Sequence, residues 1–136
     1  MSIFYNGINY VLKTPTSAEV HLSPSAMGDI FIPRSIIFQS CEYLITSISA
    51  NAFCRNNRIN SVTFDNNSEI RSIENDSFSE SSITNISIPR LTNKIGFRAF
   101  SSCSKLTSVT FPDDSDLQSI ESQAFSSTMI TNIAIP

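Results

Sequence analysis

Large apolar residues recur at a fixed spacing from Ile48 to the end of the chain. An isoleucine is followed five residues later by a phenylalanine in four places: Ile48 and Phe53, Ile73 and Phe78, Ile95 and Phe100, and Ile120 and Phe125. Each pair is followed by an apolar set: Ile59, Val62 and Phe64; Ile83, Ile86 and Ile88; Leu106, Val109 and Phe111; and Ile130, Ile133 and Ile135. Self-similarity with a period of 22 to 25 residues is typical of solenoids. We therefore expect stacked coils.

The repeat lengths alternate, which indicates how the array arose. Phe53 and Phe100 are 47 residues apart, and so are Phe78 and Phe125. Duplication of a unit of two coils explains this alternation better than four independent copies do.

Stacking is required because one coil cannot stabilise itself. About six large apolar side chains contribute on the order of 10 to 18 kcal/mol when buried, whereas ordering some two dozen residues costs roughly 30 kcal/mol or more. Stacked coils bury both faces, and their alternating apolar segments can pair as parallel strands about 4.8 Å apart. The sequence predicts one narrow core with columns of isoleucine and phenylalanine.

Two further positions follow the repeat. The third residue after each phenylalanine is small and able to form hydrogen bonds, and we expect it to be buried; these residues are Asn56, Ser81, Cys103 and Thr128. The polar segments that lead into each phenylalanine favour a single capped helical or 3₁₀ turn. Proline follows three of the predicted strands, at Pro89, Pro112 and Pro136.

The first 47 residues do not carry the repeat. Alternating apolar and polar residues at 8–12 and 18–22, with turn-forming residues between them, predict a β-hairpin. A second turn at 23–28 leads into an apolar segment, Asp29-Ile-Phe-Ile-Pro33, and a further alternating pair follows at 36–38 and 43–45. We interpret residues 1–47 as a β-rich N-terminal cap with a first irregular coil.

The repeat resembles the BspA-type leucine-rich repeats of bacterial and protist surface proteins. The segment Ala99-Phe-Ser-Ser-Cys103-Ser-Lys-Leu106-Thr-Ser-Val109-Thr-Phe111-Pro112 matches that pattern almost letter for letter, and the resemblance covers about residues 8–136. It implies a right-handed, mainly β solenoid with a parallel concave sheet, short 3₁₀ or helical turns on the convex side and an N-terminal β-hairpin cap. One departure is Ser77, which replaces the usual alanine of the second coil. The expected organisation is a single domain, 1–136, with a cap at 1–47 and repeats at 48–72, 73–94, 95–119 and 120–136.

Strand alternation singles out the surface on which we expect binding. The residues between the buried apolar positions must face the exposed side of the concave sheet. They are Ser61, Thr63, Asn85, Ser87, Ser108, Thr110, Asn132 and Ala134. Two interpretations fit this strip of small, uncharged side chains: a hydrogen-bonding surface for a protein or glycan, or a polar face that keeps the sheet soluble. It lacks the Tyr, Trp or Arg anchors of strong interfaces, so we expect modest affinity at a single site.

The residue types that carry chemistry are sparse, and we expect neither an enzyme nor a bound metal or cofactor. His21 is the sole histidine, and no motif spacing relates it to a serine or cysteine nucleophile. The acidic run Asp113-Asp-Ser-Asp116 lacks the glycine and distal glutamate of an EF-hand loop, so a solvated edge is the better interpretation. Cys41, Cys54 and Cys103 lack CxxC spacing and are expected to be free thiols, with Cys103 buried and inert.

Composition and charge exclude some classes of partner. The formal charge of −3, with nine scattered Lys and Arg, argues against nucleic acid. The chain shows no signal-peptide pattern and no long apolar segment for insertion into a membrane.

The leading hypothesis is therefore a non-enzymatic binding or adhesion module, whose ligand is a protein or glycan of a host cell or extracellular matrix. The alternative is an intracellular structural or scaffolding protein. The resemblance favours a cell-surface or extracellular location, whereas the missing leader and free thiols favour the cytoplasm. A last coil without a cap also predicts self-association end to end.

Overall fold

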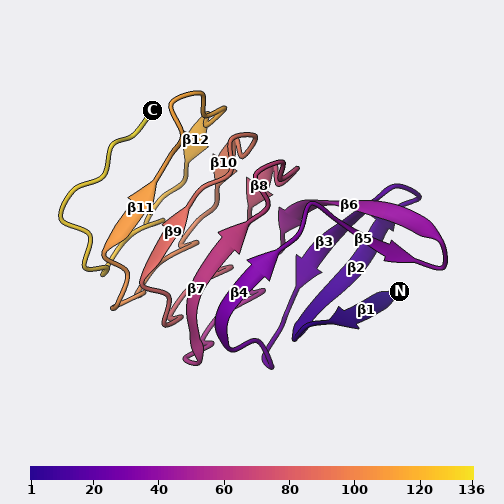
Figure 1. The fold of residues 1–136 in the computed structure, drawn as a ribbon. Helices are drawn as coiled ribbons and strands as arrows, with labels where there is room; N and C mark the ends of the chain where they lie inside the picture. The colour runs from indigo at the N-terminus through magenta and orange to yellow at the C-terminus, as the bar shows by residue number, and fades with distance from the viewer.

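The computed structural model describes residues 1–136 as a right-handed β-solenoid of about four turns, preceded by a β-rich cap (Figure 1). It contains twelve strands and no helix. The strands before the repeat are β1 (Ser2–Tyr5), β2 (Ile8–Thr14), β3 (Ser17–His21), β4 (Gly28–Ile32), β5 (Ser35–Phe38) and β6 (Cys41–Ile48). Those of the repeat are β7 (Ile59–Phe64), β8 (Ser72–Ile73), β9 (Asn85–Ser87), β10 (Lys94–Ile95), β11 (Ser108–Thr110) and β12 (Ser119–Ile120).

Two sheets run along the solenoid. The concave sheet has the order β11-β9-β7-β4 and is parallel throughout. The second sheet has the order β1-β2-β3-β6-β8-β10-β12, with β5 paired to β6. In this second sheet Ile48, Ile73, Ile95 and Ile120 are register partners in neighbouring strands. The predicted isoleucine column is thereby confirmed, and it lies on its own short parallel ladder.

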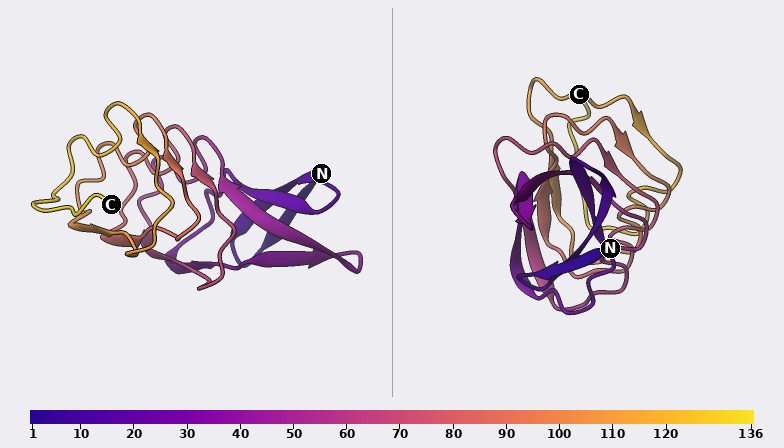
Figure 2. Two further views of the ribbon diagram at one scale, coloured as in Figure 1. Left: turned by 90° about the horizontal axis from the view of Figure 1, so that it is seen from above. Right: turned by 90° about the vertical axis from the view of Figure 1, so that its right-hand side faces the viewer.

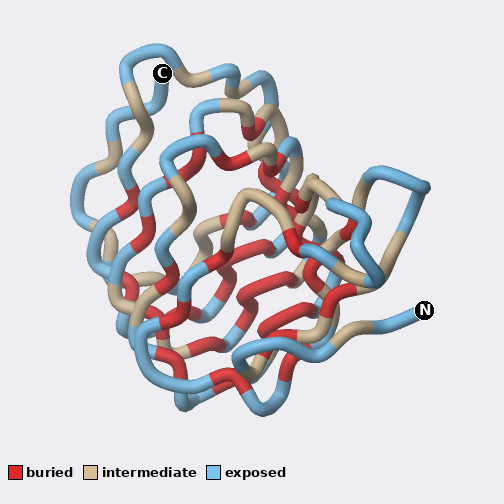
Figure 3. Tube along the Cα trace, turned by 45° about the vertical axis from the view of Figure 1, so that its right-hand side comes forward, coloured by how far each residue is buried: buried red, intermediate tan, exposed pale blue.

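The phenylalanines form a continuous stack inside the coils. Neighbouring rings from Phe53 through Phe78 and Phe100 to Phe125 lie 5.1, 5.1 and 5.3 Å apart between centroids. The first three rings are fully buried. Together with Ile48, Ile73 and Ile95 they belong to one core of 27 buried apolar residues, which follows the inner side of the coils (Figure 3). Ile120 and Phe125 are half-buried and pack against this core. The single narrow core expected from the spacing is present.

The convex turns differ from the helical or 3₁₀ turns expected for them. In each coil the residues two positions before and after the phenylalanine have positive φ: Asn51, Arg55, Asp76, Glu80, Arg98, Ser102, Gln123 and Ser127. A helix cannot form through such alternation, since its residues all need negative φ. Alternate N–H groups instead donate to the next coil, as in Phe53 N to Ser77 O at 2.6 Å and Phe78 N to Ala99 O at 2.8 Å. Bonding between coils outweighs local helix formation.

The small residues three positions after each phenylalanine are buried, as predicted, wherever a further coil covers them. Asn56, Ser81 and Cys103 are buried. The amide of Asn56 donates to Ser23 O and Ala26 O, and the thiol of Cys103 donates to Phe78 O at 2.9 Å. Thr128 donates to Phe125 O at 3.1 Å but is only half-buried, because its coil has a neighbour on one side only.

The cap confirms the predicted hairpin, shows that the further alternating pair forms a second one, and adds a strand. Strands β2 and β3 pair antiparallel, as do β5 and β6. The additional strand, β1, pairs with β2 through a two-residue turn at Asn6 and Gly7, both of which have positive φ. An Asn-Gly turn flanked by apolar residues is a strong hairpin signal, so the sequence held the information needed to predict β1.

The strand expected in the last coil does not form. Residues 131–136 are outside the two sheets, and Ile135 is 52% exposed. The last backbone hydrogen bond to an inner coil runs from Met129 N to Leu106 O at 3.0 Å. Ile130 and Ile133 are only half-buried here, so less apolar burial offsets the entropy of ordering a strand than in the inner coils.

Candidate functional site

The concave sheet presents a continuous polar strip to solvent. Its neighbouring strands are held in register by hydrogen bonds, so residues of equal position form rows across it. One row contains Asp29, Ser61, Asn85 and Ser108, and the other contains Phe31, Thr63, Ser87 and Thr110. We call these eight residues the concave strip. Parallel strands lie about 4.8 Å apart, so each row offers a polar group at that interval.

Alternation along each strand creates this surface. Val62, Ile86 and Val109 are buried, while the residues on either side of them point outward. Five of the six predicted residues on β7, β9 and β11 are exposed, and Ser61 is half-buried. The structure therefore brings these six together as expected.

Asn132 and Ala134, the last two predicted residues, do not join the strip. Both are exposed, but they lie in the segment without strand structure, where no register aligns them with Ser108 and Thr110.

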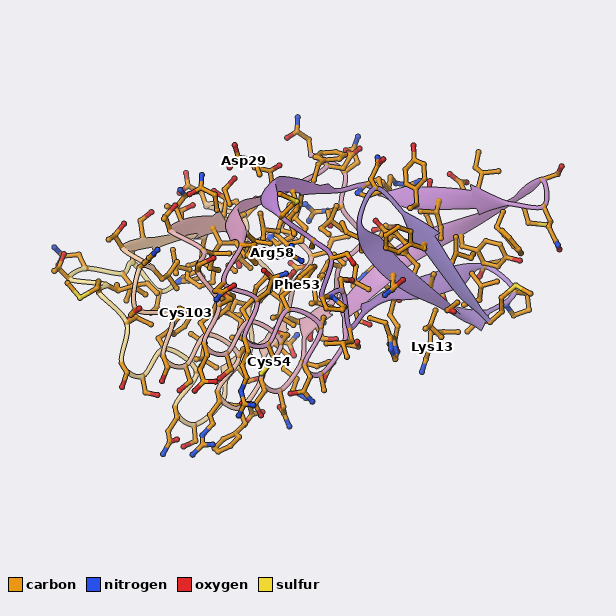
Figure 4. All side chains as sticks on the ribbon, turned by 90° about the horizontal axis from the view of Figure 1, so that it is seen from below. Lys13, Asp29, Phe53, Cys54, Arg58 and Cys103 are labelled. Carbon is orange, nitrogen blue, oxygen red and sulfur yellow. The ribbon has the colours of Figure 1, made fainter.

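At its N-terminal end, the strip carries a negative charge. The carboxylate of Asp29 accepts hydrogen bonds from Asn60 Nδ2 and Ser61 Oγ, each 2.8 Å long. These two bonds, the Asn60 bond being the larger influence, hold the pKa of Asp29 below its ordinary value of 3.8. Asp29 is therefore ionised at neutral pH, and it lies on the exposed side of β4 (Figure 4).

Two side chains of the kind that anchors ligands lie in or beside the strip, and the spacing of the repeat predicted neither: Phe31 belongs to the strip and Arg90 lies next to it. Phe31 is 53% exposed beside Thr63, because β4 joins the concave sheet ahead of the first repeat strand. Arg90 lies at the rim of an open depression of about 520 Å³ that includes Thr63 and Ser87, and it forms an ion pair with Asp114 at 3.7 Å. Alternation at Asp29-Ile30-Phe31-Ile32 was the available signal for Phe31.

The hydroxyls of the second row partly satisfy one another. Ser87 Oγ and Thr110 Oγ1 lie 2.8 Å apart and share a hydrogen bond. Ser108 makes no side-chain hydrogen bond within the protein, and Asn85 donates only to Thr84 at 3.1 Å. Both residues can therefore still bind a ligand. The amide oxygen of Asn85 can accept a hydrogen bond, and the hydroxyl of Ser108 can donate one and accept others.

The other sequence candidates lie apart from the strip. His21 Nε2 is 2.9 Å from Glu19 in the cap. The acidic run is a solvated edge in which Asp114 pairs with Arg90, and no group of three or more His, Cys, Asp and Glu side chains is placed to hold a metal ion. No helix is long and apolar enough to cross a membrane.

The cysteines are free and differ in burial. Cys41 is exposed at the start of β6, Cys54 is half-buried and Cys103 is buried. Burial raises the pKa of the Cys103 thiol and, among several influences, that of Cys54. Cys103 is thus held as the neutral thiol that its position in the core requires.

Comparison with known proteins finds one family whose sequence pattern matches most of the chain. A family model described as "BspA type Leucine rich repeat region" matches residues 30–136 in six copies. The earliest matched residues lie in β4 and its surroundings, ahead of the four repeats that can be counted from Ile48. No curated protein matches the chain.

Solved structures share the fold at low sequence identity. The pneumococcal vaccine antigen PcpA superposes with a TM-score of 0.65 at 20% identity, over 94% of this chain and 42% of that one. A leucine-rich repeat protein from Bacteroides capillosus ATCC 29799 gives a TM-score of 0.59 at 14% identity, over 97% of this chain and 96% of that one. The chain thus spans less than half of the pneumococcal protein and nearly all of the Bacteroides one.

Proposed function

The chain belongs to the BspA-type leucine-rich repeat family, and on that premise we propose that it is a non-enzymatic binding module whose concave strip contacts a protein or glycan ligand. One observation carries this proposal: six hydroxyl and amide side chains from three parallel strands share one face, with Asp29 and Phe31 beside them on β4. A surface of this kind offers hydrogen bonds in two ordered rows.

The geometry favours a ligand that is extended and rich in hydrogen-bonding groups. Rows of donors and acceptors about 4.8 Å apart suit a polypeptide backbone or a chain of sugar hydroxyls laid across the strands. The only charge of the strip itself is that of Asp29, so Coulomb attraction contributes little along most of its length. Binding is then governed by hydrogen bonds and shape.

Phe31 and Arg90 supply the aromatic ring and the guanidinium group that the six polar residues lack. Aromatic and arginine side chains are enriched among the few residues that dominate binding energy. The two lie beside different strands of the strip, Phe31 on β4 and Arg90 beyond the end of β9, with β7 between them. We propose that they anchor two parts of a ligand that contacts Thr63, Asn85 and Ser87 between them and Ser108 beyond them.

We also propose that the ligand is a molecule of a host-cell surface or extracellular matrix, so that the protein acts in adhesion. The family match supports a role in binding other molecules, and adhesion is the more specific proposal that we add to it. Labelling of surface proteins on intact source cells tests that step. Exclusively cytosolic protein would contradict adhesion and would favour a scaffolding role for the same strip.

Binding itself is tested with glycan and protein arrays. Three folded proteins are compared: the unaltered chain, a variant with Asn85→Arg and Ser108→Arg, and a control with Ser104→Arg and Ser127→Arg. The control replaces exposed serines outside the strip and matches the added charge. We expect the first variant alone to lose binding, because its side chains fill the strip. Equal binding by all three proteins would exclude the concave strip as the contact surface.

A further inference from the structure

The N-terminal cap exposes an unusual concentration of apolar side chains. Five of the ten exposed large hydrophobic residues of the whole chain line two adjoining surface grooves of the cap: Phe4, Tyr5, Met27, Phe31 and Ile37. The grooves share Tyr5 and Pro33, so the five residues form one surface, which we call the cap patch. Apolar patches of this size on a soluble protein commonly mark interaction sites.

Strand β1 borders this patch with an open edge. It is the terminal strand of its sheet, paired only with β2, and lies at the outer end of the cap (Figure 2). Leu12 N donates to Met1 O at 3.1 Å, and Met1, Ile3 and Tyr5 therefore occupy the hydrogen-bonded positions opposite β2. The N–H and C=O groups of Ser2 and Phe4 consequently point away from β2 toward the open edge.

This edge is short, but it lacks the other devices that normally prevent strands from pairing. Natural sheets protect their edges with charged residues, prolines, bulges or covering segments. The sequence of β1, Ser-Ile-Phe-Tyr, contains neither charge nor proline, and its pairing with β2 is regular. The groove beside it, about 400 Å³ in volume, is lined by Ile3, Phe4, Tyr5, Pro33, Ser35, Ile36 and Ile37, and none of these residues is charged.

We propose that two copies of this chain associate through β1, with the two strands antiparallel and Ile3 on the two-fold axis. In this register Ser2 of each copy faces Phe4 of the other, so the four outward-pointing backbone groups of each strand are satisfied in two hydrogen-bonded pairs. The sheets of both caps then continue through β2-β1-β1-β2.

The available area fits a second copy. Taking about 200 Å² for a large side chain, the exposed parts of the cap patch amount to on the order of 600 Å² per copy. Stable interfaces bury roughly 800 Å² per partner, and the edge of β1 with the groove wall supplies the difference. Neither β1 nor the groove beside it contains a charged residue, and Asp29 lines only the neighbouring groove, so the strand pairing itself brings no like charges together.

Disulfide trapping tests the register. Residues opposite each other in a non-hydrogen-bonded antiparallel pair have Cα atoms about 4.5 Å apart, within the range of about 4.4 to 6.8 Å that a disulfide spans. In a chain carrying Cys41→Ser and Cys54→Ser, we expect Ile3→Cys to form a covalent dimer rapidly under mild oxidation. The control is Ser108→Cys, an exposed position on β11, the strand of the concave sheet farthest from β4 and the cap. Equal rates for the two variants would overturn the proposed register.

Sedimentation analysis tests the association itself and separates the two ends of the molecule. The unaltered chain should approach twice its monomer mass of 15.0 kDa with rising concentration. Phe4→Lys should weaken association by about thirtyfold, the effect typical of losing an aromatic hot spot. Met129→Lys, at an apolar residue of the last coil that is 60% exposed, should leave it unchanged. A monomer at all concentrations, or a dimer that only Met129→Lys dissociates, would refute pairing through β1.

Discussion

The rings of Phe78 and Phe100 are stacked with their centroids 5.1 Å apart and their planes 4° from parallel. This contact joins the two halves of the predicted 47-residue duplication, and it repeats between each pair of neighbouring coils. In a solenoid, stability is close to a sum over neighbouring coils. The position of a phenylalanine in the stack should therefore determine how much its loss costs.

Phe100→Ala should destabilise the protein by about 3 to 5 kcal/mol, the usual cost of deleting a buried phenylalanine. Its ring is fully buried between Phe78 and Phe125, so the cavity has rigid neighbours on both sides. Urea unfolding followed by circular dichroism measures the change. Phe125→Ala is the matched control and should cost about half as much, because Phe125 is half-buried with one stacking partner. Equal losses would contradict a stack that is uncovered at Phe125.

Ser77→Ala should stabilise the protein by about 1 to 2 kcal/mol. Ser77 is fully buried and its hydroxyl has no hydrogen-bond partner, so folding removes that hydroxyl from water without replacement. The equivalent residues of the other coils, Ala52, Ala99 and Ala124, show that a methyl group fits this position. Thermal and urea unfolding check the prediction. The control, Ser101→Ala, should destabilise instead, since Ser101 Oγ is 2.9 Å from Ser126 Oγ. A loss of stability in Ser77→Ala would indicate a partner for that hydroxyl.

Asp29 should titrate below its ordinary pKa of 3.8, because Asn60 and Ser61 donate hydrogen bonds to its ionised form. The folded-state pKa is lowered, so the contribution of these bonds to stability is fully present above the unfolded value and disappears as the pH falls through the folded one. Carbon-detected NMR titration measures this pKa directly. Asn60→Ala should raise it further toward 3.8 than Ser61→Ala does, since the Asn60 bond is the larger influence. Identical titration in all three proteins would contradict the assignment.

The part of the candidate site that could be predicted is the part that lies on repeated strands. Ser61, Asn85 and Ser108 follow from alternation alone, since residues beside a buried Val or Ile must face outward. Phe31 also alternates with buried neighbours, but nothing local shows that β4 pairs with β7. That pairing joins segments about thirty residues apart in the chain and adds both a charge and an aromatic ring to the strip.

The sequence by itself determined the solenoid, its phenylalanine and isoleucine columns and the β2–β3 hairpin of the cap. Periodicity is a property of neighbouring residues, and each coil must bury the same positions to be stable. Only the tertiary structure decided which edges and faces stay open. The convex turns alternate in φ because their N–H groups bond to the next coil, and residues 131–136 leave the sheet because their isoleucines are at most half-buried. The exposed edge of β1 and the cap patch depend likewise on how distant strands close around the core.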